Sequence, residues 1–324
     1  MKNKCYIGVD VGGTKISGAL INLKGKILIR AKIPSPKKAQ AKGVTNAIAC
    51  VIAEILKKTR SKKITVLGIG IGVPGIVDVT RRKIINTPNI RLSGVLLASI
   101  IQKKFKIKVL LENDVNLGTL GEKTFGSAKH ARNVVGLFPG TGIGGGIIIN
   151  NELVSGSHGA AGELGHMIMD LRGPFCGCGN RGCLEALASR WAIERDIHKA
   201  IKNHKKTIIK KLIKNNLAVI KSGILKEALK KKDSLTKKIM SEKSKILGQA
   251  CINLRRIFDP EMIILGGGLI EACGDFMLPI IRKTVRADRF FKKLKPCPIL
   301  PSTLGDDAVL LGAAALFKLV NTSA

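Results

Sequence analysis

The stretch from residue 159 to residue 185 is rich in side chains that bind metals. One imidazole and three thiols follow one another closely, those of His166, Cys176, Cys178 and Cys183. They have the number and type of ligands of a closed tetrahedral zinc site, with no position left open for catalysis. The alternatives are a disulfide among the thiols, a cysteine nucleophile, and a His166 that is only a hydrogen-bonded core residue; the spacing favours a structural zinc ion. Glu163 and Glu185 flank the set and are acceptors that can face a ligand.

Three glycine clusters each end an apolar segment. They are Gly12 and Gly13 with Thr14 and Lys15, Gly140 and Gly142 with Thr141, and Gly266 to Gly268, centred on Gly267. Glycine lets backbone N–H groups approach phosphate oxygens, and a threonine hydroxyl adds a donor. Asp10, at the end of the first segment, is placed to hold Mg²⁺, which takes one or two carboxylates. The three clusters together predict a bound nucleotide, whereas any one of them alone can be a structural turn.

The nucleotide is not predicted to be a nicotinamide. Two segments, beginning at Gly70 and Gly140, match the glycine pattern of dinucleotide sites. Neither is followed by the helix that the motif requires, and the sequence contains no Walker A motif.

A polar pair follows the apolar segment that ends at Leu111. Ligands bind at the carboxyl ends of strands in α/β sheets, so Asn113 and Asp114 are candidates for a catalytic site. Asp114 can accept the proton of a hydroxyl that attacks a phosphate, while Asn113 positions that hydroxyl. The alternative is that both residues cap the helix that follows. The local sequence supports the two interpretations equally.

The composition describes a large, basic chain with an aliphatic core. The 324 residues are 45% hydrophobic and 3% aromatic, and the formal net charge is +34. Residues 199–245 contain 16 lysines but no arginine and no aromatic residue. Base readout favours arginine, and single-strand binding needs stacking aromatics. We therefore expect solvated helix faces and no nucleic-acid partner.

The same composition predicts a cytoplasmic protein that does not enter a membrane. The sequence shows no signal peptide, and no apolar run reaches the length of a transmembrane helix. Eight cysteines in a chain of this length, three of them clustered, suit a reducing compartment with metal ligation.

Two successive runs of strands and helices are expected to position these residues. The first has strands at 5–10, 17–23, 26–33, 64–73 and 108–111, with helices at 44–57 and 93–104. The second has strands at 134–137, 147–149, 262–265 and 299–300, with helices at 244–258, 276–285 and 307–320. A basic helical region spans 189–245, with breaks near 215–216 and 222–223. This pattern predicts an α/β protein. Its small lobe is residues 1–115, completed by a terminal helix at about 307–324, and its large lobe is residues 116–306.

The motifs together resemble those of bacterial sugar kinases of the ROK family (repressors, open reading frames and kinases), most closely its glucokinases. The resemblance rests on the segments Asp10–Lys15, Glu112–Asn116, Gly140–Gly146, Gly162–His166 and Cys176–Glu185, and continues at Leu265–Gly268 and Leu304–Ala308. It runs nearly from end to end.

This resemblance implies the two-lobe actin/hexokinase/Hsp70-like (ribonuclease H-like) fold, with the active site in a cleft between the lobes. It also implies ATP, Mg²⁺ and phosphorylation of a hexose at its 6-hydroxyl, in a homodimer or homotetramer. Asp114 would be the catalytic base. The sugar would contact Asn89, Asn113, Glu163, His166 and Glu185, with one ring nitrogen of His166 on zinc and the other towards the sugar. The phosphates would lie along Gly12, Gly13, Thr14, Lys15, Gly140, Thr141 and Gly142, and the adenosine near Gly267.

Some alternatives remain within the family. Where the family usually has a tryptophan after Pro88-Asn89, this chain continues with Ile90-Arg91, so the hexose preference is open between glucose and amino sugars such as N-acetylglucosamine or N-acetylmannosamine. Polyphosphate is an alternative phosphoryl donor. The repressor branch is disfavoured because its helix-turn-helix precedes the first phosphate motif, whereas Asp10 lies ten residues into this chain.

Overall fold

The computed structural model of the chain describes residues 3–36, 39–59, 64–78, 80, 82–88, 90–213 and 219–322. The chain forms two compact units. The first consists of Met1–Arg132, Gly146–Gly162 and Asp306–Ala324, and the second of Asn133–Gly145 and Glu163–Gly305. The predicted division into lobes at residue 115 stays a prediction. Within the described ranges, no helix combines the length and the apolar character needed to cross a bilayer.

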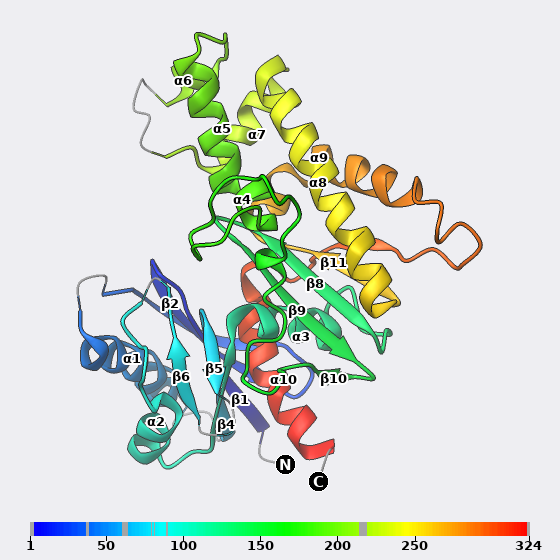
Figure 1. Cartoon of the computed structure of the whole chain (residues 1–324). Helices are drawn as coiled ribbons and strands as arrows, with labels where there is room; N and C mark the ends of the chain where they lie inside the picture. The colour runs from blue at the N-terminus through cyan, green and yellow to red at the C-terminus, as the bar shows by residue number, and fades with distance from the viewer. Residues whose placement is uncertain are drawn as a thin grey trace. The chain divides into compact units, whose positions relative to one another are not determined.

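The first unit is built on a five-stranded mixed sheet in the order β3-β2-β1-β4-β7 (Figure 1). Its strands are β1 (Asn3–Val11), β2 (Lys15–Asn22), β3 (Ile27–Pro34), β4 (Ile64–Val73) and β7 (Val109–Asn113). Strands β1, β4 and β7 run parallel, whereas β2 and β3 form an antiparallel meander with β1. Because the three parallel strands end at the same edge of the sheet, the residues after β1 and β7 are brought close together.

A short hairpin, β5 (Ile76–Asp78) and β6 (Lys83–Asn86), follows β4 and was not predicted. The helices of this unit are α1 (Ala41–Thr59), α2 (Leu97–Phe105), α3 (Asp114–Phe125) and α10 (Ala308–Thr322). Strand β10 (Glu152–Leu153) pairs with the end of β9 (Ile143–Ile149).

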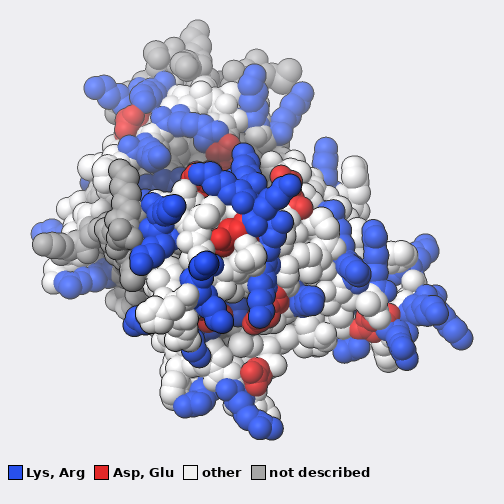
Figure 2. Space-filling model, turned by 90° about the horizontal axis from the view of Figure 1, so that it is seen from above, with Lys and Arg blue, Asp and Glu red and all other residues white. Residues whose placement is uncertain are grey.

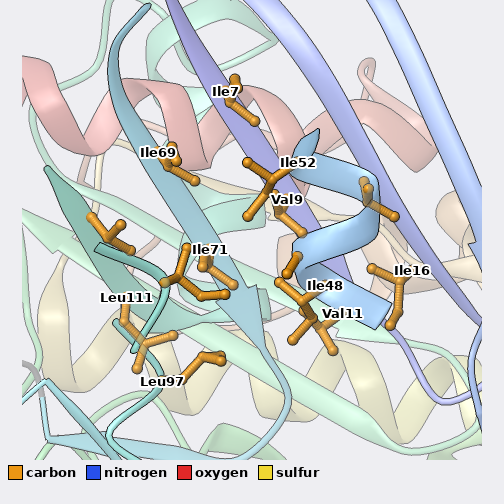
Figure 3. Packing of buried hydrophobic residues seen from close by; sticks show 14 of the residues in the cluster. Ile7, Val9, Val11, Ile16, Ile48, Ile52, Ile69, Ile71, Leu97 and Leu111 are labelled. Atoms are coloured by element: carbon orange, nitrogen blue, oxygen red, sulfur yellow. The ribbon is translucent and has the colours of Figure 1, made fainter. Parts of the chain in front are cut away.

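One face of the first sheet forms the core drawn in Figure 3. Ile7 and Val9 of β1 and Ile69 of β4 pack there against Ile48 and Ile52 of α1, all fully buried. The alternation of side chains along β1 directs every second residue to this face. Burying an isoleucine side chain contributes about 1.5–3 kcal/mol, so this aliphatic cluster holds α1 firmly on the sheet without aromatic residues.

Glycines on the opposite face of the sheet admit α10 at close range. A Cβ on Gly8 would lie 2.2 Å from the carbonyl oxygen of Leu310, and one on Gly70 would lie 2.1 Å from that of Ala313. Gly312 meets the backbone of α3 in the same way. The C-terminal helix is therefore packed directly onto β1, β4 and α3, and α3 carries Asp114 at its first position.

The second sheet has the order β10-β9-β8-β11-β12. Strands β8 (Val134–Pro139), β11 (Met262–Leu265) and β12 (Ile299–Pro301) belong to the second unit and run parallel in register. The helices of this unit are α4 (Leu184–Ala188), α5 (Arg190–Lys202), α6 (Ile209–Leu212), α7 (Ser222–Lys230), α8 (Ser234–Phe258) and α9 (Gly268–Arg286). Short 3₁₀ turns occur at Leu164–His166 and Gly305–Asp307. The α/β class expected from the sequence is confirmed.

Two helix starts differ from the predictions. Helix α8 runs unbroken from Ser234, not from Ser244, because Asp233 caps it and Ile239, Met240 and Leu247 are buried at helical spacing. Helix α9 begins at Gly268 rather than Phe276, because burial of its first two turns outweighs the low helix propensity of glycine. The break predicted at 215–216 lies outside the described residues.

The lysine-rich helices bury a narrow apolar stripe and expose their basic residues. Helix α7, for example, buries Leu225 and Ala228 while Lys226 is exposed. On the face seen in Figure 2, Lys and Arg side chains are spread widely, with Asp and Glu lying singly among them. Lys243 is an exception, since it is buried beside Asp196, with 2.5 Å between Nζ and Oδ2.

Asp233 organises the start of α8 and gives a first testable prediction. Its carboxylate accepts hydrogen bonds from the backbone and hydroxyl of Thr236, the N–H of Ile208 and the hydroxyl of Thr207. Burial acts to raise the pKa of Asp233, but these hydrogen bonds outweigh it and lower the pKa. Asp233→Ala is expected to reduce the free energy of unfolding by about 2 kcal/mol.

The pH dependence of this effect follows from the lowered pKa. The contribution of Asp233 is present above the ordinary carboxylate pKa of 3.8 and is lost as pH falls through the lower folded value. Urea unfolding at pH 7 and pH 3 measures the difference between wild type and variant, which should shrink at pH 3. Asp275→Ala, an exposed change on α9, serves as the control and should stay within about 0.5 kcal/mol. A loss for Asp233→Ala as small as the control's would show that the cap is unimportant.

Candidate functional site

Acidic side chains gather at the edge of the first sheet where β1 and β7 end. Asp10 is the penultimate residue of β1, and Asp114 is the first residue of α3, directly after β7. The pKa of Asp10 is raised to about 7, first by burial and then by repulsion from Asp114 and Asp306, against the opposite effect of Lys15. Carboxylates that repel one another in this way favour a bound cation, and carboxylate oxygens are ligands that Mg²⁺ prefers. The predicted role of Asp10 as a magnesium ligand is compatible with this charge and stays a prediction.

The first glycine turn places a lysine beside this acidic group. The N–H of Gly12 donates to the carbonyl of Lys15, which closes the turn between β1 and β2, and the N–H of Ser35 donates to the carbonyl of Thr14. The Nζ of Lys15 lies 2.7 Å from Oδ2 of Asp306, and this hydrogen bond raises the pKa of the lysine. Lys15 is therefore held as a cation at the mouth of the turn, where it can meet a phosphate.

Asn113 is the N-cap of α3. Its Oδ1 accepts from the N–H groups of Val115 and Asn116, at 2.8 and 3.0 Å, and its Nδ2 donates to the carbonyl of Gly75. The capping interpretation of Asn113 is thus correct for this residue. Asp114 lies in the first turn of the same helix, where the positive end of the helix dipole stabilises a carboxylate.

The predicted metal ligands come together in the second unit. The ligand atoms of His166, Cys176, Cys178 and Cys183 all lie within 4.8 Å of one another. The Sγ of Cys178 is 3.6 Å from that of Cys183, and the Sγ of Cys176 is 3.7 Å from Nδ1 of His166. A tetrahedral zinc ion with Zn–S bonds of about 2.3 Å holds its sulfurs about 3.8 Å apart, so the spacing fits zinc.

The thiols of the metal set differ in their pKa values, since the pKa of Cys176 is raised and that of Cys178 is lowered. Burial raises the pKa of Cys176 to about 12, so that in the absence of a positive charge this sulfur stays protonated. Zinc needs thiolates and supplies the charge that stabilises them. Backbone turns hold the loop in shape, since the N–H of Cys176 donates to the carbonyl of Asn180 and the N–H of Leu184 to that of Met167.

The two ring nitrogens of His166 face different groups. Nδ1 lies towards Cys176 in the metal set, whereas Nε2 is 4.0 Å from Oε2 of Glu163. Both side chains are partly exposed. The geometry leaves Nε2 and the Glu163 carboxylate able to hydrogen-bond a polyhydroxyl ligand while Nδ1 binds the metal.

Glu185 links the metal loop to the second glycine turn. Its Oε2 accepts the N–H of Ile143 at 2.8 Å, and its Oε1 is 3.7 Å from the Sγ of Cys176. A Cβ on Gly142 would lie 2.2 Å from Oε2 of Glu185, so a larger residue at this position would displace the Glu185 carboxylate. Glu185 is predicted to contact a ligand, and its carboxylate also holds the second glycine turn through the N–H of Ile143.

The turn at Gly140–Gly142 lies at the start of α5. The N–H of Arg190 donates to the carbonyl of Gly140, and its Nη2 donates to Oγ1 of Thr141 at 3.0 Å. The third cluster positions Gly267, with φ at +78°, as the N-cap of α9. The N-terminus of a helix of this length presents free N–H groups suited to an anion.

Sequence reasoning missed two charged neighbours of the predicted turns. Asp306 lies beside Lys15, and its only signal was the Gly305-Asp306-Asp307 run before the last helix. Arg190 lies beside Thr141, and nothing local marked it within a basic region. Asn89, a predicted sugar ligand, falls outside the described residues. The structure groups the other candidates by unit, with Asp10, Lys15, Asn113 and Asp114 in the first, and the metal set with Glu163, Glu185, Thr141 and Gly267 in the second.

Comparison with known proteins decides the family. The model of the ROK family matches residues 6–320. The chain belongs to the ROK family. A glucokinase of Halalkalibacterium halodurans is 31% identical over 319 residues, covering 98% of this chain and 96% of that protein. A xylose repressor of Bacillus spizizenii is 34% identical, covering 96% of this chain and 76% of that protein.

Solved structures of the ROK family have the same fold. The ROK family glucokinase of Streptomyces griseus, in complex with glucose and AMPPNP, has a TM-score of 0.81 and 32% identity, covering 96% of this chain and 98% of that one. The predicted two-lobe sugar kinase fold is thus confirmed, and the likeness to glucokinases supports sugar kinase activity.

Proposed function

We propose that the chain transfers the γ-phosphate of ATP to the 6-hydroxyl of a hexose, with glucose as the preferred substrate. The observation that carries the proposal is the acidic group at the ends of β1 and β7, where burial, and after it repulsion from Asp114, raises the pKa of Asp10 to about 7. Phosphoryl transfer needs a base near the attacking hydroxyl and a metal-bound phosphate chain, and this group offers both.

Each predicted residue has a defined role in this proposal. Asp114 takes the proton of the 6-hydroxyl, and Asp10 holds Mg²⁺, which when bound offsets charge on the phosphates. Lys15 and the turns formed by Gly12, Gly13, Thr14, Gly140, Thr141 and Gly142 lie along the phosphates, with the adenosine near Gly267. The sugar is held by Asn89, Asn113, Glu163, His166 and Glu185. Zinc on His166, Cys176, Cys178 and Cys183 does no chemistry and keeps Glu163 and His166 in place.

We further propose that the protein is cytoplasmic and acts as a homodimer or homotetramer.

Relatives that are glucokinases, and a solved relative holding glucose and AMPPNP, support both the hexose and the donor. The exposed lysines are solvated helix faces in this account, with no nucleic acid as partner.

A hexose panel tests the substrate. Release of ADP is measured with glucose, N-acetylglucosamine, mannose and fructose, each with ATP and with polyphosphate as donor. Glucose with ATP should give the highest kcat/KM, because buried polar groups left unpaired by a wrong sugar cost about 1–3 kcal/mol each. A higher kcat/KM for N-acetylglucosamine would reassign the substrate, and turnover with polyphosphate alone would reassign the donor.

A second candidate, sugar-dependent regulation without turnover, is favoured by the 34% identity to a xylose repressor. The two functions are separated by measuring sugar binding and ADP release on one preparation. Tight sugar binding with no ADP release, with Mg²⁺ and ATP saturating, would favour the regulator.

A further inference from the structure

A pocket of the first unit, lined by none of Asp10, Asp114 and Asp306, lies along the outer edge of its sheet. It has a volume of about 1160 Å³. Its walls are strand β7, helix α3, the turn before β10 and the end of α10. Leucines supply much of the lining, among them Leu110, Leu120, Leu153 and Leu316. Polar and charged side chains complete the lining, and pockets that combine apolar walls with polar groups are typical of small-molecule sites.

The floor of this pocket is the free side of an edge strand. Strand β7 ends the order β3-β2-β1-β4-β7, and the N–H of Ile69 donates to the carbonyl of Lys108. In a parallel pair the two backbone groups of one residue point to the same side, and the side alternates along the strand. With Ile69 opposite Val109, the residues whose N–H groups face outward are Val109, Leu111 and Asn113.

In two of these three residues, the outward backbone groups form hydrogen bonds with side chains. The N–H of Val109 donates to Oε1 of Gln102, its carbonyl accepts from Nη2 of Arg82, and the N–H of Asn113 donates to Oε1 of Glu112. Among the described residues, the outward backbone groups of Leu111 have no such partner. Leu111 lines the pocket and is only 5% exposed. A buried backbone donor without a partner costs free energy, which a bound ligand can recover.

Two cations in the pocket lack an acidic partner within the described part of the chain. Arg82 is half-buried, and its guanidinium donates only to the neutral oxygens of Gln102 and Val109. Lys123, on α3, is also half-buried and forms no ion pair. Lys318 lies at the same pocket, 4.6 Å from the centre of the Phe125 ring. Half-buried cations without a counter-charge favour an anion.

The acidic residues of the pocket do not offset these cations. Glu112 is buried, and its Oε1 already accepts from the N–H of Asn113 and the Nδ2 of Asn116. Burial raises its pKa. Glu152, the first residue of β10, is exposed.

From these observations we propose that the pocket between β7, α3 and α10 binds a small amphipathic anion, whose aliphatic part lies on the leucines and whose anionic group meets Arg82 and Lys123. A medium-chain carboxylate has this chemistry. The site is separate from the residues assigned to phosphoryl transfer, and its test does not depend on the proposed kinase activity.

The test is calorimetric titration of the whole chain with decanoate, below the concentration at which decanoate aggregates, and with the neutral decanamide. Decanoate should bind saturably with one site per chain, and decanamide about tenfold more weakly, since a hydrogen bond to a charged group contributes about 1.5–3 kcal/mol and 1.4 kcal/mol is a factor of ten. Lys123→Gln should weaken decanoate about tenfold, and Lys123→Glu more strongly, without changing the decanamide affinity.

Matched variants make the result decisive. Lys226→Gln, an exposed lysine of α7 in the other unit, should bind decanoate like wild type. Arg82→Gln should also weaken decanoate binding. Because Arg82 donates a hydrogen bond to the carbonyl of Val109, this variant can fail to fold, and Lys123→Gln then remains as the test. The proposal is overturned if wild type shows no saturable binding of decanoate, if decanamide binds equally well, or if Lys123→Glu binds decanoate like wild type.

Discussion

Replacing Asp114 with asparagine is expected to lower kcat for hexose phosphorylation by about 10³-fold, within the 10²- to 10⁴-fold range of general-base catalysis. Asparagine is close to aspartate in shape but cannot take the proton of the attacking hydroxyl. KM for the hexose should change little, because Asp114 acts mainly in the transition state. The measurement is ADP release under saturating ATP and hexose.

Two controls separate catalysis from folding in this experiment. Because the first turn of α3 is capped by Asn113, the helix should persist in the Asp114→Asn variant, and its far-ultraviolet circular dichroism should match wild type. Asp275→Asn, at an exposed position of α9, should keep wild-type kcat. An Asp114→Asn variant with kcat within tenfold of wild type would exclude Asp114 as the base.

Removal of one zinc ligand is expected to have the second large effect. Cys178 is exposed, so Cys178→Ser leaves no cavity in the core and acts through the metal alone. The variant should lose zinc, and the melting temperature should fall on the order of 5–10 °C as the loop from His166 to Cys183 loosens. Hexose affinity should fall at least about tenfold, because Glu163 and His166 are no longer held in place.

Cys50→Ser is the matched control, since Cys50 is exposed and lies outside the metal set. It should retain the metal, the melting temperature and the hexose affinity of wild type. Native mass spectrometry measures the zinc content of both variants, and titration calorimetry measures the hexose affinity. Wild-type protein without zinc, or a Cys178→Ser variant that binds hexose normally, would contradict the proposed role of the loop.

The metal set was predictable because its spacing is local. Four ligand residues within one short glycine-rich loop are close in space because they are close in sequence, and the structure places their ligand atoms within 4.8 Å of one another. The strands of the first sheet were predictable for a similar reason, since the apolar residues of each strand and the glycines that end it are close together in the sequence. Asp10 and Asp114 follow from these strands, because parallel strands that end at one edge bring their next residues together.

Contacts between residues distant in sequence were not predictable from the chain. Asp306 reaches Lys15 only because glycines at positions 8, 70 and 312 let α10 pack against β1, β4 and α3. In the second unit, Arg190 reaches Thr141 because the turn after β8 meets the start of α5. No local sequence pattern predicts the contact of Asp306 with Lys15 or that of Arg190 with Thr141.

Of the two interpretations of Asn113 and Asp114, the structure shows the cap at Asn113, and the catalytic role of Asp114 stays a prediction. Asn113 has its Oδ1 in the cap and its Nδ2 on the carbonyl of Gly75, whereas Asp114 is close enough to Asp10 to shift the pKa of that residue. One residue shapes the helix start and the other stands in the acidic group.

The most direct test of the central proposal is to identify the phosphorylated product. Glucose, ATP and Mg²⁺ are incubated with the protein, and phosphorus–proton correlation spectroscopy locates the phosphate on the sugar. The account predicts glucose 6-phosphate formed in equal amount to ADP by the wild type and absent with Asp114→Asn. Phosphate on another hydroxyl, or ADP formed without a sugar phosphate, would contradict it.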